Sequence, residues 1–516
     1  MSVRVRFAPS PTGRLHIGAL RTALFDHLFA AHHGGVNILR IEDTDRTRYS
    51  AEAEAEFIQA LEWVGVRFHE GPHVGGPHGP YHQSQRKEAG IYAREIAKLL
   101  ESGHAYKAFD TPEELEQMRE YQQINKQPVG YFGGVWRDAT PCQVEEAEKA
   151  GKPFVIRLRI PRGQKIAIQD AIRGRIEWNA DDVDDPVLIK ADGMPTYHFA
   201  AMVDDHLMGI THVLRGEEWI SSAPKHQALL DAFGWEAPTW VHVPVIKGTD
   251  GKKLSKRHGA TSVLDYRSAG YLPEPIVNFI ALLGWAPGGD RELMTPAELA
   301  EAFDIRGLQP SSAVFDIEKL NWMNGHYIRQ LSLGDLVAKV SGWVSLPETA
   351  AYWTSDEGES EEVENRRRTW QEAELLRSAL QNRPKLAEAA LALEQERVRT
   401  LAEFPGACSF FFVDEVTFDE KAVAKWFGHE HVRQMFSDLI AWCDERASCT
   451  VEECEGLLRD YAAKLGLEKL GPVVHPVRVA LTGKTVGPGL FELMSVLGPA
   501  TMAARLQHAL SRLNRT

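Results

Sequence analysis

Residues suited to binding a phosphate chain lie near the start of the sequence. Within residues 3–25, a strand of alternating apolar and basic residues runs into a proline- and glycine-rich loop, and a helix follows. His16 lies at the expected start of this helix, where free backbone N–H groups and the helix dipole favour an anion. Gly18 would let a ligand approach the backbone. The alternative is an ordinary strand-to-helix turn in which the histidine only caps the helix.

A second candidate phosphate site is the basic, glycine-rich segment 247–261, which reads KGTDGKKLSKRHGAT. The ammonium groups of Lys253 and Lys256, with Ser255 between them, could meet the negative charge of a phosphate chain. A basic surface loop or a localisation signal is the alternative.

Charged residues also follow the second expected strand, residues 36–42. We expect this strand to be buried on both sides apart from Arg40 and Glu42. The cluster consists of Glu42, Asp43, Asp45, Arg46 and Arg48. Ligands bind at the carboxyl ends of strands in doubly wound sheets, although a solvated turn that caps the next helix is the alternative.

Arg215 is a basic residue beside two acids at an expected strand end, a position that packing explains poorly. It precedes Glu217 and Glu218 at the end of an apolar segment. A guanidinium can bind a carboxylate through two charge-assisted hydrogen bonds, which a carboxamide cannot match. A structural ion pair with one of the two glutamates is the alternative.

The elements expected around these residues form a split α/β domain, an insertion and a helical tail. The insertion spans about 104–195, and its first helix should begin at Thr111 with Pro112 in its first turn. From about 330 onward strand patterns vanish, and 354–368 reads as a solvated loop or helix extension. Further expected elements are strands at 154–160, 173–178 and 187–193, a helix at 87–102 and a helical linker at 263–288.

Composition limits the class of protein. The 516 residues suggest several domains, no long apolar run predicts a membrane span, and five scattered cysteines fit a reducing cytosol. The net charge of −14 argues against a strongly basic nucleic-acid binder but leaves room for local basic patches. His73, His78 and His82 lack a metal-site spacing, and we expect no zinc.

Five motifs in order resemble those of one family. They are His16-Ile17-Gly18-Ala19, IEDTD at 41–45, YHF to VDDH at 197–206, RGEEW at 215–219 and KLSKR at 253–257. The first and last resemble the HIGH and KMSKS signatures of class I aminoacyl-tRNA synthetases, and the sequences around them resemble bacterial glutamyl-tRNA synthetases. Ala19 replaces the second histidine of the signature and is assigned no role.

The resemblance implies a multidomain fold. An α/β Rossmann catalytic domain carries an inserted α/β acceptor-binding domain and is followed by all-α anticodon-binding domains. The implied ranges are 1–103 and 196–250 for the two Rossmann halves, 104–195 for the insertion, 251–329 for the KLSKR loop and stem-contact region, and 330–415 and 416–516 for two helical anticodon-binding domains.

The resemblance also implies residue roles. His16, Lys253 and Lys256 would be catalytic. ATP would contact His16, Gly18, Glu218, Trp219, Lys253, Ser255 and Lys256, and glutamate would contact Arg6, Ala8, Ser10, Glu42, Tyr197 and Arg215. The expected tRNA contacts are Arg48, Arg397, Arg478 and Leu490. Ala201 departs from several relatives, which carry an asparagine at this position.

The implied activity is that of a cytoplasmic, monomeric glutamate–tRNA ligase. It would use ATP and Mg²⁺ to join L-glutamate to tRNA(Glu) through a glutamyl-adenylate, without a membrane partner. A glutaminyl-tRNA synthetase is the first alternative, but that family ends in β-barrels where this tail reads as helical. A tRNA-binding pseudo-enzyme is the second, and the sequence leaves open whether tRNA(Gln) is also charged.

Overall fold

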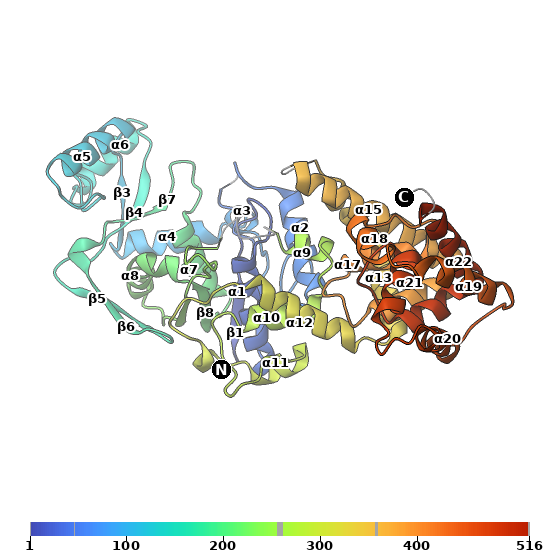
Figure 1. Cartoon of the computed structure of the whole chain (residues 1–516). Coiled ribbons are helices and arrows are strands. Elements are labelled where there is room, and N and C mark those ends of the chain that lie inside the picture. Colours follow the sequence, from blue (N-terminus) through green and yellow to red (C-terminus); the bar gives the residue numbers. More distant parts are fainter. Residues whose placement is uncertain (1, 46, 255–261, 357–359, 514–516) are drawn as a thin grey trace. The chain divides into compact units, whose positions relative to one another are not determined.

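The computed structural model describes residues 2–45, 47–254, 262–356 and 360–513 (Figure 1). Its internal contacts divide the chain into two units. Unit 1 consists of Met1–Val263 and Ile276–Asp316, and unit 2 consists of Leu264–Pro275 and Ile317–Thr516.

Unit 1 begins with a β-α-β segment. Strands β1 (Arg4–Phe7) and β2 (Val36–Leu39) pair in parallel, with Arg6 opposite Ile38, and helix α1 (Ile17–His32) connects them. Apolar side chains of α1 at helical spacing, among them Leu20, Leu24 and Leu28, are buried. The strand, loop and helix expected from the sequence are therefore confirmed.

The second half of the α/β sheet comes from residues beyond the insertion. Strands β8 (His212–Gly216) and β9 (Thr239–Val243) pair in parallel, and helix α8 (Ala223–Phe233) connects them. The backbone N–H of Thr211 donates to the carbonyl of Arg4 at 2.9 Å, which brings the start of β8 beside β1. The split parallel sheet predicted from the sequence is confirmed, and its strand ends converge on the polar motifs.

The insertion contributes strands to two sheets. Strands β3 (Ala105–Ala108), β4 (Val155–Leu158) and β7 (Val187–Ile189) form an antiparallel sheet. The hairpin of β5 (Lys165–Asp170) and β6 (Gly174–Asn179) instead extends the α/β sheet, since Asp170 pairs with Trp240 of β9. This contact places Asp170 beside the strand that follows Arg215.

Helix starts in the insertion follow the expected chemistry. Helix α5 (Pro112–Ile124) begins at Thr111, whose hydroxyl accepts from Glu114 N while the Glu114 side chain accepts from Thr111 N. The predicted start at Thr111 is confirmed. Other helices of unit 1 are α2 (Ala51–Trp63), α3 (Gln83–Glu88), α4 (Ile91–Glu101), α6 (Pro141–Lys149), α7 (Tyr197–Leu207), α11 (Pro296–Ala302) and the 3₁₀ turns η1 (Ala180–Asp182), η2 (Glu217–Ser222) and η4 (Ile305–Gly307).

Two helix predictions need correction. The expected helix at 87–102 is divided into α3 and α4 by Gly90, whose φ of +70° places it in the left-handed region. The expected linker at 263–288 contains two short helices, α9 (Val263–Ser268) and α10 (Pro273–Ala281). Glycine at 270, with φ +87°, lies between them.

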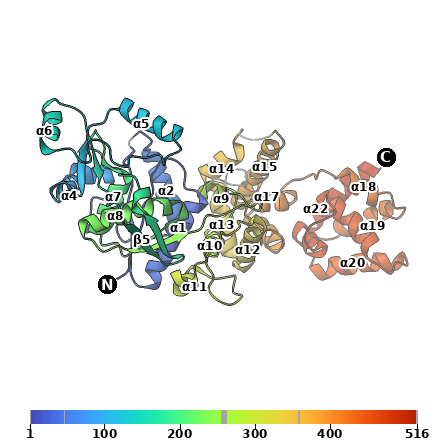
Figure 2. The same ribbon diagram turned by 90° about the vertical axis from the view of Figure 1, so that its left-hand side faces the viewer.

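Unit 2 is helical throughout its described residues, as predicted from residue 330 onward (Figures 1 and 2). Its helices are α12 (Ile317–Gln330), α13 (Leu333–Ser345), α14 (Pro347–Thr354), α15 (Ser360–Asn382), α16 (Pro384–Glu394), α17 (Glu403–Cys408), α18 (Glu420–Trp426), α19 (Val432–Asp444), α20 (Val451–Lys464), α21 (Gly471–Thr482) and α22 (Leu490–Leu513), with the 3₁₀ turn η5 (Ser409–Phe411). The acidic segment 354–368 is helical from Ser360 onward, and residues 357–359 lie outside the described residues.

No helix among the described residues combines the length and the apolar composition that crossing a bilayer requires.

Candidate active site

His16 caps the first helix. Its Nδ1 accepts a hydrogen bond from Ala19 N at 3.2 Å, and the side chain is exposed at the mouth of α1. The capping alternative is therefore observed, but it uses only one ring nitrogen. Since Nδ1 accepts, the neutral ring carries its hydrogen on Nε2, which leaves that atom as a donor for a phosphate oxygen.

Two other predicted residues share the surroundings of His16. Burial and the charge of Lys253 lower the pKa of His16, whereas Glu218 raises it, so the three groups lie within electrostatic reach. Lys253 is exposed on a turn where Leu254 N donates to Ile246 O at 2.9 Å. The predicted residues Ser255 and Lys256, and Arg46 of the acidic cluster, lie outside the described residues.

Glu218 and Trp219 lie on η2, directly after β8. A Cβ on Gly216 would lie 2.1 Å from a carboxylate oxygen of Glu218, so only glycine lets this side chain lie against the backbone. The ring of Trp219 is 4.4 Å from that of Tyr197, centroid to centroid. The residues expected to contact the nucleotide therefore adjoin those expected to contact the amino acid.

Buried charges surround the expected amino-acid pocket. Asp205 of α7 accepts from Arg6 Nε at 3.0 Å and from Arg40 Nη1 at 2.6 Å, and Arg40 Nη2 donates to Glu42 at 2.9 Å. The expectation that Arg40 and Glu42 are exposed is wrong, because Arg40 is 0% and Glu42 7% exposed. Asp205 explains the difference, since it supplies the partner that a buried guanidinium requires.

Tyr197 is electrostatically coupled to this cluster. Burial raises the pKa of Glu42, and the adjacent Arg40 works against that shift. Burial and Glu42 raise the pKa of Tyr197 to about 12, so its hydroxyl keeps its proton at neutral pH. Arg6 and Arg215 also act on Tyr197. The structure thus brings together the predicted residues Arg6, Glu42, Tyr197 and Arg215.

Arg215 is held by two histidines. Its Nε donates to His242 Nε2 at 3.0 Å, its Nη1 contacts His226 Nδ1 at 3.0 Å, and its guanidinium lies 4.7 Å from the ring centroid of Trp240. The proposed ion pair with Glu217 is not formed, because Glu217 accepts from Arg173 and from Val245 N. Burial is the main cause of the lowered pKa of Arg215.

The loop residues of the expected glutamate site are only partly enclosed. Ala8 is half-buried and Ser10 is exposed, and the carbonyl of Pro9 between them accepts from Glu42 N at 2.9 Å. Ala201 is fully buried one helical turn after Tyr197. Ala201 therefore presents only a methyl group at the position where several relatives of the resembled family carry an asparagine.

Two of the predicted tRNA contacts lie together in unit 2. Arg397 is exposed and its Nε pairs with Glu394 at 3.0 Å, while Arg478 Nη1 donates to Pro488 O at 2.6 Å. Arg397 and Glu394 both shift the pKa of Arg478, whose main shift is a lowering by burial. The two arginines therefore lie within electrostatic reach of each other and of Glu394. The third, Arg48 of unit 1, is exposed and pairs with Asp45 at 2.6 Å.

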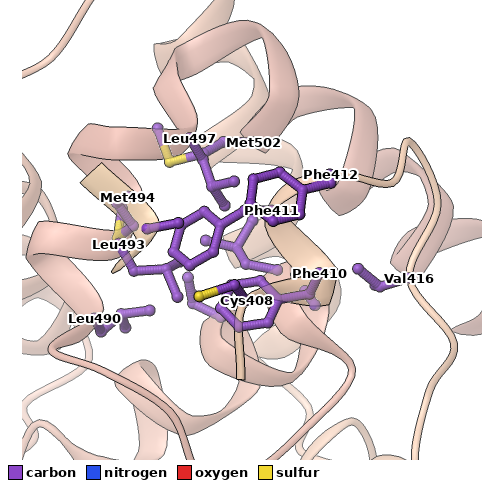
Figure 3. Close-up of a cluster of buried hydrophobic side chains, with 14 of the residues drawn as sticks. Cys408, Phe410, Phe411, Phe412, Val416, Leu490, Leu493, Met494, Leu497 and Met502 are labelled. Atoms are coloured by element: carbon purple, nitrogen blue, oxygen red, sulfur yellow. The ribbon is translucent and has the colours of Figure 1, made fainter. Parts of the chain in front are cut away.

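Leu490 is buried in the apolar core of unit 2. It is 4% exposed and lies near Cys408, Phe410 and Leu493 (Figure 3). As the first residue of α22 it continues the buried stripe of that helix. Its contact with tRNA stays a prediction.

Several residues of the site escaped the sequence analysis. Asp205 was visible within a motif but without a role, and His226, His242 and Asp170 carried no signal. Their partners are distant in sequence, and the contact of β5 with β9 could not be read from periodicity.

One group in the described chain could hold a metal ion, namely His32, His33 and Asp304. His32 Nδ1 contacts Glu301 O at 2.7 Å, and Asp304 is paired with Arg306 at 2.9 Å. His32 ends α1 and His33 caps it, about 24 Å along the helix from His16, whereas Asp304 lies between α11 and η4. The expectation of no zinc stays a prediction.

The comparisons with known proteins agree with this geometry. The family of class I tRNA synthetases (E and Q), catalytic domain, matches residues 2–322, and an anticodon binding domain matches residues 366–510. The chain therefore belongs to the class I tRNA synthetases of the glutamate and glutamine type. The resemblance drawn from the five motifs is confirmed.

Relatives that match over nearly the whole of both chains are glutamate–tRNA ligases. A glutamate–tRNA ligase of Elusimicrobium minutum is 41% identical over 99% of each chain, and one of Thermus thermophilus is 41% identical over 99% of this chain and 100% of its own. A crystal structure of a glutamate tRNA ligase from Elizabethkingia meningosepticum in complex with its amino acid has a TM-score of 0.85 at 34% identity, covering 99% of this chain and 100% of that one.

Proposed function

We propose that this chain is a glutamate–tRNA ligase that joins L-glutamate to the terminal adenosine of tRNA(Glu) through a glutamyl-adenylate. One observation carries the proposal. Arg215 is a buried guanidinium without a carboxylate partner among the described residues, and Arg215 and Glu42 both act on the hydroxyl of Tyr197. An amino acid with a side-chain carboxylate fits a pocket with a free cation at one end and an acid at the other.

The charges around the pocket favour glutamate. Arg6, Arg40 and Arg215 supply three positive charges, and Glu42 and Asp205 supply two negative ones. Glutamate carries a net charge of −1 and would neutralise the one positive charge that these five residues leave uncompensated. We assign its α-ammonium group to Glu42 and its side-chain carboxylate to Arg215, with Arg6 nearby, while glutamine would leave the cation unmatched.

In the first step, the α-carboxylate of glutamate attacks the α-phosphorus of ATP. A new P–O bond forms, the bond to the β-phosphate oxygen breaks, and pyrophosphate leaves. His16 donates from Nε2 to a phosphate oxygen, and Lys253 meets the charge that develops on pyrophosphate. We keep Lys256 and Ser255 as further phosphate contacts. ATP enters as its Mg²⁺ complex.

In the second step, a ribose hydroxyl of the terminal adenosine attacks the acyl carbon and AMP leaves. Trp219 and Glu218 are assigned to the nucleotide. Gly18 is assigned to it as well, because a glycine lets a ligand approach the backbone beside His16, and a Cβ at this position would lie 3.3 Å from the His16 ring. We assign the exposed Arg397 and the half-buried Arg478 to the anticodon, because arginines at or near the surface suit unstacked bases. Arg48 is assigned to the tRNA backbone.

The cellular setting belongs to the same proposal. We infer a cytoplasmic monomer with tRNA(Glu), L-glutamate and ATP as substrates, and we retain the six domain ranges given above. The helical unit 2 supports this choice over a glutaminyl enzyme, whose family was expected to end in β-barrels.

The test is charging of purified tRNA(Glu) and tRNA(Gln) with labelled glutamate and glutamine. We expect glutamate on tRNA(Glu), and ATP–pyrophosphate exchange that requires tRNA. Incorporation of glutamine alone would favour the glutaminyl enzyme. Binding of tRNA without charging would favour the pseudo-enzyme, and full exchange without tRNA would contradict the expected order of binding.

A further inference from the structure

The two histidines that hold Arg215 can only be hydrogen-bond acceptors. A guanidinium carries donors and no acceptor, so His242 Nε2 and His226 Nδ1, each 3.0 Å from Arg215, carry no hydrogen. Both rings are fully buried, and Arg215 is 5% exposed. Protonation of either ring would place a second cation against Arg215, so this geometry requires both histidines to be neutral.

The outer nitrogen of each ring is also engaged. His242 Nδ1 lies 2.7 Å from Asp170 Oδ2 and donates to it, and the other oxygen of Asp170 accepts from Ile172 N and Arg173 N, both at 2.9 Å. His226 Nε2 lies 3.0 Å from His198 Nδ1 and donates to it. The chain from Asp170 to His198 therefore fixes one tautomer of each ring. Burial and Arg215 lower the pKa of His226 well below its usual range, in agreement with this assignment.

The result is a positive charge that is oriented but not neutralised. Two nitrogens of Arg215 are held by histidines and its side chain also bonds to Tyr197, but no carboxylate among the described residues pairs with it. Arg6 and Arg40 in the same unit differ, because both donate to the carboxylate of Asp205. A carboxylate at either histidine position would pair with Arg215 in the same way and remove its charge.

We propose that His226 and His242 set the preference of the pocket for a carboxylate over a carboxamide, by positioning Arg215 as acceptors without neutralising it. The inference rests on the proposed function, in which Arg215 binds the side chain of the substrate. The histidines do not touch that substrate and act through Arg215, so they are positioning residues.

The test compares isosteric variants that differ only in charge. His226→Asn can accept from Arg215 through its amide oxygen, whereas His226→Asp places a carboxylate at the same point. We expect His226→Asn to raise the KM for glutamate less than about fivefold and His226→Asp to raise it more than about tenfold, with smaller changes in kcat. The ratio of kcat/KM for glutamate over glutamine should fall in the Asp variant and be largely retained in the Asn variant.

A second pair guards against a variant that fails to fold. His242→Gln and His242→Glu repeat the comparison on the other side of Arg215, and circular dichroism checks the fold of each. Equal losses in the acid and amide members of both pairs would show a merely structural role and overturn the inference. An acid variant with unchanged glutamate preference would overturn it as well.

Calorimetric titration of the full chain with L-glutamate and L-glutamine separates this inference from the proposed function. Wild type that binds glutamate selectively but charges no tRNA would refute the proposed function alone. The inference then stands if the acid variants lose this selectivity and the amide variants keep it. Wild type that binds the two amino acids equally would overturn the inference directly.

Discussion

The two units of the chain bury different kinds of side chain. Among the described residues, unit 1 buries Arg6, Arg21, Asp26, Arg40, Glu42, Asp43, Glu70, Arg86, Glu95, Arg157, Asp170, Asp185, Asp204, Asp205 and Arg215, whereas unit 2 buries only Glu394 and Arg505 of this charged class. The core of unit 2 is built from aromatic, aliphatic and sulfur-containing side chains, part of which Figure 3 shows.

In unit 1 the residues around the pocket also stabilise the fold. In unit 2 stability and recognition depend on largely different residues. Buried charges are costly unless each is paired, so unit 1 depends on the same ion pairs that shape its pocket. In unit 2 the arginines assigned to tRNA lie at or near the surface, while Arg505 is satisfied by backbone carbonyls such as Phe410 O at 2.6 Å. Substitutions at the site should therefore destabilise unit 1 far more than unit 2.

The largest effect is expected for Asp205→Asn. The change leaves the buried guanidinium groups of Arg6 and Arg40 without their shared carboxylate. We expect a loss of about 3–5 kcal/mol in unit 1, measured by hydrogen exchange in β1 and α7. Glu177→Gln at an exposed pair with Arg175 is the control and should cost less than about 1 kcal/mol. Similar losses in both variants would remove the contrast between buried and exposed pairs.

A cavity in the apolar core of unit 2 tests whether the stability of this unit is independent of glutamate binding. Leu493 is fully buried in its apolar core, and Leu493→Ala should cost about 2–5 kcal/mol in that unit. Binding of L-glutamate should persist, since the assigned pocket lies in unit 1. Hydrogen exchange in α19 and α22 measures the first effect and calorimetry the second. Leu465→Ala, at an exposed site, is the matched control. A parallel loss of glutamate binding would show that the units are not separable.

Asp26 makes the stability of unit 1 depend on pH. It is fully buried on α1, and neither carboxylate oxygen has a hydrogen-bond partner. Burial raises its pKa well above the usual value, although Arg6 opposes the shift. Its contribution is therefore complete below the unfolded pKa of about 4 and is lost as the pH rises through the folded pKa.

Asp26→Asn should remove this dependence. Relative to wild type, the variant should gain up to about 1.4 kcal/mol for each pH unit between the unfolded and folded pKa of Asp26. Urea titrations at pH 5, 6 and 7 measure the difference, and Asp182→Asn at an exposed site serves as control. If the difference in free energy of unfolding between variant and wild type stays constant across this range, burial does not raise the pKa of Asp26 and the prediction is wrong.

Local elements and the division into α/β and helical parts were accessible from the sequence. The alternation in β1 and the Thr111 cap depend on neighbouring residues, which a sequence displays directly. The fold class could be predicted because these local elements are all consistent with one arrangement, an α/β part followed by a helical part. Gly90 shows the limit, since its left-handed conformation divides a pattern that reads as one helix.

The network around the pocket could not be foreseen in the same way. Arg40 was expected to be exposed, yet it is buried between Glu42, two positions away, and Asp205, which is 165 positions away and could not be foreseen. His226 and His242 gave no signal for the same reason. The burial of Leu490 was not foreseen either, because the packing of α22 against the rest of unit 2 cannot be read from the motif.

The smallest effect on stability is expected for Arg397→Ala. The side chain is exposed, but it pairs with the buried carboxylate of Glu394, so its loss should lower the free energy of unfolding by about 1–3 kcal/mol, less than the loss at Asp205. Binding of tRNA(Glu) should weaken by roughly 1–3 kcal/mol, the cost of losing an arginine that hydrogen-bonds the edge of a base. Charging kinetics with tRNA(Glu) and tRNA(Gln) measure the effect, and relaxed discrimination against tRNA(Gln) is expected. Arg399→Ala, which removes a neighbouring exposed arginine paired with Glu318, is the control. If the two variants weaken tRNA equally, general charge rather than base recognition explains the contact, and recognition in unit 2 would then reside elsewhere on its surface.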